Sequence, residues 1–219
     1  MSLELFAHPF SSYCQKVLIA LREKGLDFEL RLLGPDQTDT AAEFARLWPI
    51  QRMPLLRAGA TVLMESSVII EWLDLQHPNT PRLLPTDPQA ALPVRLLDRL
   101  LDQYVMTPMQ KLVFDCIRQP EQRDAHGVAE AHALLERAYA WLDNQLPEAG
   151  WAVGAAFSLA DCAAAPSLFY ADWVHEIPAA HTKLRAYRQR LLAHPSVARA
   201  VDEGRPYRAW FPPGAPDRD

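Results

Sequence analysis

Met53-Pro54-Leu55-Leu56, with Glu65-Ser66-Ser67 shortly after it, is the stretch that decides the fold of this 219-residue chain. The Met53-Pro54 bond is a candidate for the cis form, because X-Pro bonds alone adopt it at low cost and proline can begin a strand but not lie within one. Residues 54–57 and 61–64 alternate about a glycine-containing turn and predict an antiparallel hairpin. A helix over 66–76 closes the unit.

The residues before this stretch change between the periods of a strand and of a helix. Residues 3–7 and 28–33 alternate in hydrophobicity as strands do, whereas 13–23 and 39–48 carry apolar residues at helical spacing. Lys24-Gly25 gives the first helix a basic last turn and a glycine stop. Because a strand, a helix and a second strand in this order favour parallel pairing, the first third predicts an α/β domain.

Prolines crowd the next segment, at positions 78, 81, 85 and 88, where they interrupt any helix. We therefore predict a linker at 79–88 between a first domain at 1–78 and a second at 89–219. The second domain reads as helices only, with apolar periodicity at 95–117, 128–146, 158–173, 179–192 and 196–203. The tail at 212–219 is proline-rich and polar, and we expect it to be loose.

Composition and charge narrow the classes of function. Hydrophobic residues make up 49% and charged residues 22%, which is enough for a packed core and carries no disorder signature. The net charge of -5 without long runs of either sign argues against nucleic acid and anionic membranes as partners. The chain shows no signal segment and no apolar run near the ~20 residues that span a bilayer, so we expect a cytoplasmic protein.

The cysteines and histidines predict neither disulfides nor a metal. Cys14, Cys116 and Cys162 are too widely spaced for a disulfide framework or a zinc site. The seven histidines do not combine with acids or cysteines at a ligand spacing. We therefore expect a reducing compartment and no bound metal.

The segment Phe10-Ser11-Ser12-Tyr13-Cys14 lies where the first strand gives way to the first helix. Backbone N–H groups and the positive end of the helix face this loop and favour an anion such as a thiolate, which a serine hydroxyl can stabilise further. The alternative is that Ser11 or Ser12 only caps the helix, as serine most often does at this position.

Two further points in the sequence suit a peptide ligand. A cis bond would present the N–H and C=O of Met53 for antiparallel pairing with an extended peptide. Glu65 and Ser66 open a helix, where a carboxylate, a hydroxyl and free N–H groups together suit an α-amino acid end. A simple helix cap is the alternative for Glu65 and Ser66. Ser158 and Asp161 have the spacing of a capping box, which we interpret as folding information.

In their order and spacing these residues resemble the cytosolic glutathione transferase family, from about residue 3 to residue 203. The resemblance implies a thioredoxin-like α/β N-terminal domain, an all-α helical-bundle C-terminal domain, and glutathione as co-substrate without a metal. In this family the strand-to-helix loop is catalytic, the residue before a cis-proline pairs with the cysteinyl part of glutathione, and an acid-serine pair binds its γ-glutamyl end. By resemblance these roles fall to Ser11 or Ser12, to Met53 with Pro54, and to Glu65 with Ser66.

Aligned on Gln15, the glutaredoxin-like Cys-Pro-x-Cys positions become residues 11–14, so serine replaces the nucleophilic cysteine as in serine-type classes. Cys14 falls on the resolving position, turned into the helix. Tyr13 is a third candidate for the catalytic hydroxyl, although this register places it two residues inside the helix. Gln51 and Arg52 are candidates to contact the glycyl carboxylate of glutathione.

Three functions are compatible with this resemblance. The first is a detoxifying transferase that adds the glutathione sulfur to an electrophilic, largely apolar substrate. The second is a glutathione-dependent cis-trans isomerase of the maleylacetoacetate isomerase type, and the third is a non-catalytic glutathione or ligand binder. The resemblance also implies a homodimer, whose interface we expect on the 65–75 helix and the start of the helix at 95.

Overall fold

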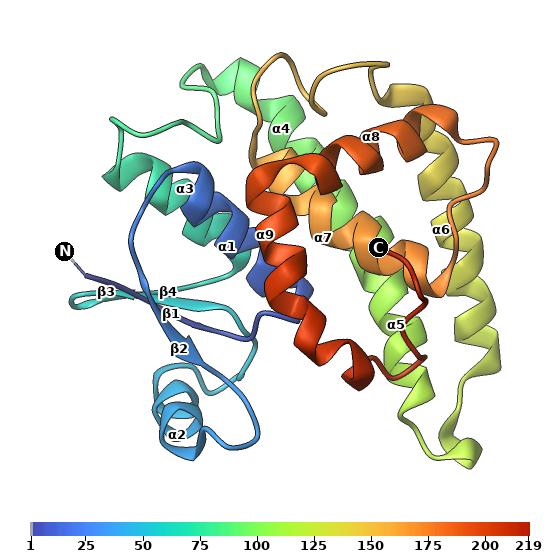
Figure 1. The fold of residues 1–219 in the computed structure, drawn as a ribbon, viewed down its shortest axis with the longest axis horizontal. Coiled ribbons are helices and arrows are strands. Elements are labelled where there is room, and N and C mark those ends of the chain that lie inside the picture. Colours follow the sequence, from blue (N-terminus) through green and yellow to red (C-terminus); the bar gives the residue numbers. More distant parts are fainter. Residues whose placement is uncertain (1) are drawn as a thin grey trace.

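The computed structural model describes residues 2–219, so Met1, which the predicted first domain includes, lies outside the described residues. Its sheet has four strands in the order β2-β1-β3-β4 (Figure 1). The strands are β1 Leu3–Ala7, β2 Glu29–Leu32, β3 Leu55–Ala58 and β4 Thr61–Met64. β1 pairs with β2 in parallel and with β3 antiparallel, and β3 and β4 form the predicted hairpin.

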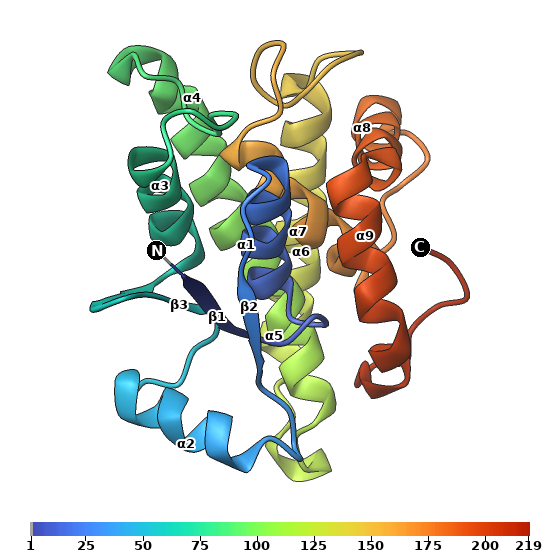
Figure 2. The same ribbon diagram turned by 60° about the vertical axis from the view of Figure 1, so that its left-hand side comes forward.

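Helices cover both faces of this sheet, as Figure 2 shows. α1 Ser12–Glu23 and α3 Ser66–Gln76 lie on one face, and α2 Thr38–Leu47 lies on the other. The alternation of β1 decides which side chain meets which helix: Leu5 packs in the large core that contains α1, whereas Phe6 packs against Phe44 of α2. The thioredoxin-like α/β half predicted from the sequence is therefore present.

The rest of the chain is helical, with α7 at its centre and in contact with α1. The elements are α4 Pro88–Leu100, η1 Leu101–Met106, α5 Thr107–Cys116, η2 Pro120–Gln122, α6 Ala125–Gln145, α7 Leu159–Val174, α8 Thr182–Ala193, α9 Pro195–Gly204 and η3 Arg205–Trp210. α7 begins with the predicted capping box, in which the Ser158 N–H donates to Asp161 Oδ2 at 2.9 Å. The all-α prediction for this half is confirmed, while the limits of the two domains and of the linker stay a prediction.

The helix predicted at 95–117 differs from the prediction in two ways. It begins at Pro88, because Asp87 accepts hydrogen bonds from the first turn and proline at the first helical position loses no bond. It also contains the π-helical turn η1, in which the Thr107 N–H and hydroxyl both reach the Asp102 carbonyl. Pro108 has no N–H for an α-helical bond and its ring would crowd the preceding turn, which accounts for the wider turn.

The sequence predicted a loose tail at 212–219, but the structure holds this tail by side-chain contacts. Asp219 accepts hydrogen bonds from Arg205 and Arg208, and Arg218 pairs with Asp172 of α7 at 2.8 Å. Phe211, directly before the tail, is buried at 6% exposure. Arg205 and Arg208 of the preceding η3 and Asp172 of α7 hold the tail. Because Asp172 lies more than forty residues away in sequence, the local composition of the tail did not reveal this contact.

None of the helices within residues 2–219 is both long and apolar enough to cross a membrane.

Candidate active site

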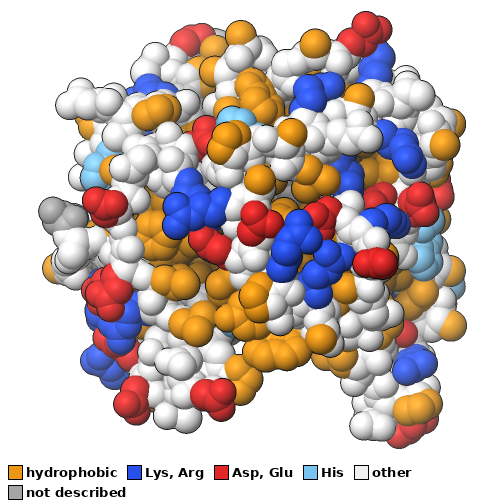
Figure 3. All heavy atoms as spheres, viewed as in Figure 1, with side chains coloured by type: hydrophobic (Ala, Val, Ile, Leu, Met, Phe, Trp, Pro, Cys, Tyr) orange, Lys and Arg blue, Asp and Glu red, His pale blue; other side chains and the backbone are white. Residues whose placement is uncertain are grey.

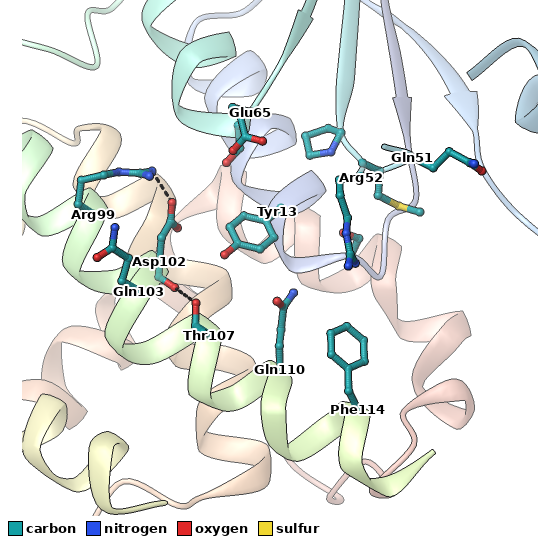
Figure 4. A pocket seen from close by; sticks show the side chains of 14 residues that line it. Tyr13, Gln51, Arg52, Glu65, Arg99, Asp102, Gln103, Thr107, Gln110 and Phe114 are labelled. Atoms are coloured by element: carbon teal, nitrogen blue, oxygen red, sulfur yellow. Dashed lines mark hydrogen bonds and ion pairs between the residues drawn. The ribbon is translucent and has the colours of Figure 1, made fainter. Parts of the chain in front are cut away.

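A cavity of about 530 Å³ lies between the α/β half and the helical half of the molecule (Figure 4). Its α/β wall consists of Ser11, Tyr13, Gln51, Arg52, Met53, Pro54, Glu65 and Ser66. Its helical wall consists of Arg99, Asp102, Gln103, Thr107, Gln110 and Phe114. The structure thus brings together every predicted site residue except Ser12 around one cavity.

A second, apolar cavity of about 200 Å³ adjoins the first. Its lining is Phe10, Ser11, Ser12, Met109, Gln110, Val113, Phe114, Tyr170, Trp210, Phe211 and Pro212, so none of the described residues around it is charged. Ser11, Gln110 and Phe114 line both cavities. In the space-filling view the molecule is hollowed between its two lower lobes, with hydrophobic side chains along the roof (Figure 3).

Ser11 occupies the N-cap position of α1, yet its side chain makes no capping hydrogen bond. Its backbone is fixed instead, because its N–H donates to the His8 carbonyl at 3.0 Å and its carbonyl accepts from the Gln15 N–H at 2.8 Å. The capping alternative therefore does not describe the Ser11 side chain, and Ser11 lines both cavities.

Ser12 and Tyr13 are the first two residues of α1 and face different spaces. Ser12 is buried at 8% exposure and lines only the apolar cavity. The Tyr13 ring stands in the middle of the larger cavity, with its hydroxyl toward the helical wall (Figure 4). Burial, together with the charge of Asp102, raises the pKa of Tyr13, so its hydroxyl keeps its proton and can act as a donor.

Cys14 is fully buried in the core behind this loop. Burial raises the pKa of its thiol to about 11, although a hydrogen bond with the Ser11 side chain acts in the opposite direction. A thiol that is protonated and closed to solvent cannot attack a substrate. This agrees with the inward position predicted for Cys14.

Glu65 and Ser66 stand at the N-terminus of α3. Ser66 is 4% exposed, and Glu65 is an exposed residue that makes no side-chain capping bond to the helix. Glu65 has φ +68° and ψ 114°, a backbone conformation that costs an L-residue about 1–3 kcal/mol. The structure therefore holds a carboxylate at the helix opening in spite of the strain.

The segment before β3 carries the other predicted contacts. The Met53-Pro54 bond is cis, as the sequence predicted. Gln51 has φ +54° and is, with Glu65, one of the two non-glycine residues of the described chain with positive φ. Both line the larger cavity. Figure 4 shows the Gln51 side chain directed away from the cavity centre and the Arg52 side chain directed toward Gln110 and Phe114.

Comparison with known proteins places this geometry in a family. Residues 5–94 match the profile of the glutathione S-transferase N-terminal domain, and residues 105–195 match that of the C-terminal domain. A solved glutathione S-transferase from Methylobacterium radiotolerans, in complex with glutathione sulfonate, is 34% identical and has a TM-score of 0.80, with 92% of this chain and 95% of that chain covered. The chain belongs to the cytosolic glutathione transferase family.

Curated relatives in the family carry different names. A maleylacetoacetate isomerase of Rattus norvegicus is 29% identical over 173 residues, which cover 77% of this chain and 77% of that protein. A stringent starvation protein A homolog of Pasteurella multocida is 30% identical over 169 residues, with 76% and 74% covered.

The helical wall of this family member was not predicted residue by residue. Arg99, Asp102 and Gln103 reach the cavity from the end of α4 and from η1. Buried Lys16 of α1 holds Asp102, with Nζ 3.1 Å from Asp102 Oδ2 and 2.5 Å from Asp98 Oδ1. Burial raises the pKa of Asp102, and the charge of Lys16 opposes that shift. A lysine and two aspartates separated by more than eighty residues give no local motif in the sequence.

The structure also joins histidines that the sequence left apart. His132 of α6 and His175, which directly follows α7, have their Nδ1 atoms 3.0 Å apart, and His175 Nε2 contacts Glu136 at 2.7 Å. Within residues 2–219 no group of three or more His, Cys, Asp or Glu side chains is arranged to hold a metal ion.

Proposed function

We propose that this protein is a glutathione transferase that activates the thiol of glutathione and adds its sulfur to an electrophilic, largely apolar substrate. The observation that carries the proposal is the pair of adjoining cavities, one polar and one apolar, with Ser11 in the lining of both. A conjugation reaction needs this arrangement, because the sulfur must contact an activating donor and the second substrate together.

The larger cavity suits a peptide with charges of both signs. It is lined by two arginines, Arg52 and Arg99, and by two acids, Glu65 and Asp102, whereas glutathione carries one ammonium and two carboxylates. We place the γ-glutamyl end at the N-terminus of α3, where backbone N–H groups and Ser66 receive its carboxylate and Glu65 receives its ammonium. Met53 pairs with the cysteinyl backbone, and Arg52, beside Gln51, receives the glycyl carboxylate.

The activating hydroxyl is that of Ser11 in this proposal. Ser12 lines only the apolar cavity and Tyr13 only the polar one, whereas Ser11 lines both. The Ser11 hydroxyl donates a hydrogen bond to the glutathione thiolate, which the positive end of α1 also favours. The proton of the thiol leaves to solvent, and the sulfur attacks the electrophile in the apolar cavity; with an aryl halide the carbon–sulfur bond forms, the carbon–halogen bond breaks and halide leaves to solvent.

The isomerase is the second candidate, and the 29% identical maleylacetoacetate isomerase of Rattus norvegicus favours it. A maleyl substrate carries carboxylates, which need cationic or hydrogen-bonding partners when they are bound. No charged residue lines the apolar cavity in the described chain, so the transferase with an uncharged substrate fits its chemistry better.

Steady-state kinetics with glutathione and a nitro-activated aryl halide test the proposal. We expect saturable turnover with both substrates, and faster turnover than cis-trans isomerisation of a maleyl compound. Absence of conjugation while glutathione binds would leave the non-catalytic binder, and isomerisation alone would leave the second candidate.

Variants of the loop test the assignment of the hydroxyl. Loss of one preorganised donor to a developing anion costs roughly 10²–10³ in kcat, and we expect this for Ser11→Ala together with a raised pKa of the bound thiol. Ser12→Ala and Tyr13→Phe are the matched controls, and each should retain most of the activity. Full activity in Ser11→Ala with loss in either control would move the role to that residue.

We further propose that the protein is a homodimer of the cytoplasm. Exposed apolar side chains gather on α3 and α4, with Val68 at 52%, Leu75 at 69%, Leu92 at 54% and Leu96 at 58% exposure. Leu92 and Leu96 are one helical turn apart on α4, so they share a face. A two-fold contact would cover these side chains. The free thiols of Cys14, Cys116 and Cys162 suit the reducing conditions of the cytoplasm.

A further inference from the structure

The loop that carries Ser11 is held by side-chain hydrogen bonds to the two carbonyls just before it. The Tyr170 hydroxyl of α7 donates to the Phe10 carbonyl at 2.9 Å. The Gln15 side-chain amide of α1 donates to the Pro9 carbonyl at 2.9 Å. The position of Ser11 is therefore tied to a helix that lies more than 150 residues away in sequence.

Tyr170 and Gln15 also fix each other. Gln15 Nε2 lies 3.2 Å from the Tyr170 hydroxyl oxygen, so this oxygen accepts one hydrogen bond and donates another. Both side chains are buried, at 3% and 2% exposure. Burial raises the pKa of Tyr170, although the hydrogen bond from Gln15 opposes the shift, so the tyrosine keeps its proton and stays a donor.

Gly204 of α9 packs against both Gln15 and the loop. A Cβ atom on Gly204 would lie 3.2 Å from Gln15 Nε2, 3.5 Å from the Pro9 carbonyl oxygen and 3.7 Å from the Phe10 ring. The Phe10 ring also packs edge-on against Tyr170, with 5.5 Å between the ring centroids. The loop therefore cannot shift toward α7 or α9 without breaking these contacts.

We propose that Tyr170 is a positioning residue that sets the Ser11 hydroxyl against the glutathione sulfur. It acts through the Phe10 carbonyl and together with Gln15. The inference rests on the proposed role of Ser11 in thiol activation. A displacement of the donor by a fraction of an ångström weakens a preorganised hydrogen bond to an anion. The hydrogen bond from Tyr170 to the Phe10 carbonyl should therefore affect the reaction rate as well as the stability of the fold.

Tyr170→Phe removes the hydroxyl and keeps the ring, so the wall of the apolar cavity is preserved. We expect kcat to fall about three- to tenfold and the pKa of the bound thiol to rise by about half a unit to one unit, with little change in KM for glutathione. The thiolate is followed by its ultraviolet absorbance during a pH titration of the glutathione complex. Gly204→Ala places a methyl group against Gln15 Nε2 and the Pro9 carbonyl oxygen, and it should also raise the pKa of the bound thiol.

Tyr139→Phe is the matched control. The Tyr139 hydroxyl is equally buried and donates to the carbonyl of His175 at 3.0 Å, away from both cavities. Both tyrosine variants should lose similar unfolding free energy, but only Tyr170→Phe should change the thiol pKa. Equal thiol pKa values in the two variants and the wild type would overturn the inference.

A double-mutant cycle separates this inference from the proposed function. If Tyr170 acts through Ser11, Tyr170→Phe should not lower kcat further in a Ser11→Ala background. Independent, multiplicative losses would overturn the positioning role while the role of Ser11 stands. Full activity of Ser11→Ala alone would instead overturn the proposed role of Ser11.

Discussion

Replacement of Glu65 by glycine is expected to stabilise the fold and to weaken glutathione binding at once. Glu65 has φ +68°, its side chain is exposed and makes no capping bond, so the folded protein loses little when the side chain is removed. Such a conformation costs an L-residue about 1–3 kcal/mol, and the greater freedom of glycine in the unfolded chain offsets about 0.5–1 kcal/mol of the relief. A net gain of about 1 kcal/mol raises Tm by roughly 2–4 °C in a chain of this size.

The same replacement removes the carboxylate that we place against the ligand ammonium. A hydrogen bond to a charged group contributes roughly 1.5–3 kcal/mol, and the exposure of Glu65 favours the lower end. We therefore expect the Kd for glutathione to rise about tenfold in a calorimetric titration.

Glu65→Ala is the control that separates the two effects, because it removes the carboxylate and keeps the Cβ atom that causes the strain. It should bind glutathione as weakly as Glu65→Gly and show no gain in Tm. If both variants unfold at the same temperature, the strain argument is wrong. If Glu65→Ala binds glutathione like the wild type, the γ-glutamyl end does not lie at this helix.

Three further expectations follow from the packing. Leu96→Glu places a charge in the exposed apolar patch of α3 and α4 and should give a monomer in light scattering at concentrations where the wild type is dimeric; an unchanged mass would contradict the proposed interface. Burial and the neighbouring His175 lower the pKa of His132 in the folded protein. The unfolded chain therefore binds a proton at His132 at a higher pH than the folded chain does, and the unfolding free energy should fall as pH drops below about 6.5. Denaturant unfolding at pH 7 and 5.5 should show a smaller fall for His132→Asn, and an equal fall would refute this linkage. Cys14→Ala empties part of the core and should cost about 1–2 kcal/mol of unfolding free energy with kcat nearly unchanged, whereas a hundredfold loss of kcat would implicate the thiol.

The secondary structure of the α/β half could be predicted closely because its signals are local. The strand at Leu3–Ala7 and the helix at Ser66–Gln76 have the predicted limits, since alternation, helical periodicity and turn residues act over neighbouring positions. The predicted start of α4, at residue 95, is seven residues too late because a local signal was misinterpreted. Pro88 was counted with the prolines that interrupt helices, although Asp87 before it makes proline a favourable first residue.

The sequence by itself determined the α/β wall of the candidate site and left its hydroxyl undecided. Ser11, Ser12 and Tyr13 are adjacent, and the register on Gln15 places Ser11 at the nucleophilic position without showing which space each side chain faces. Only the tertiary structure separates them, because the cavities they line are formed by α4, α5 and α7 of the other half.

Tertiary structure alone also decided the helical wall and the contacts that hold the loop. Asp102 reaches the cavity from the π-helical turn η1, where buried Lys16 pairs with its carboxylate. Tyr170 meets the Phe10 carbonyl only after α7 has packed against α1. The chain pattern fixes which faces are apolar, but side chains far apart in sequence meet only through packing, whose geometry depends on the whole core.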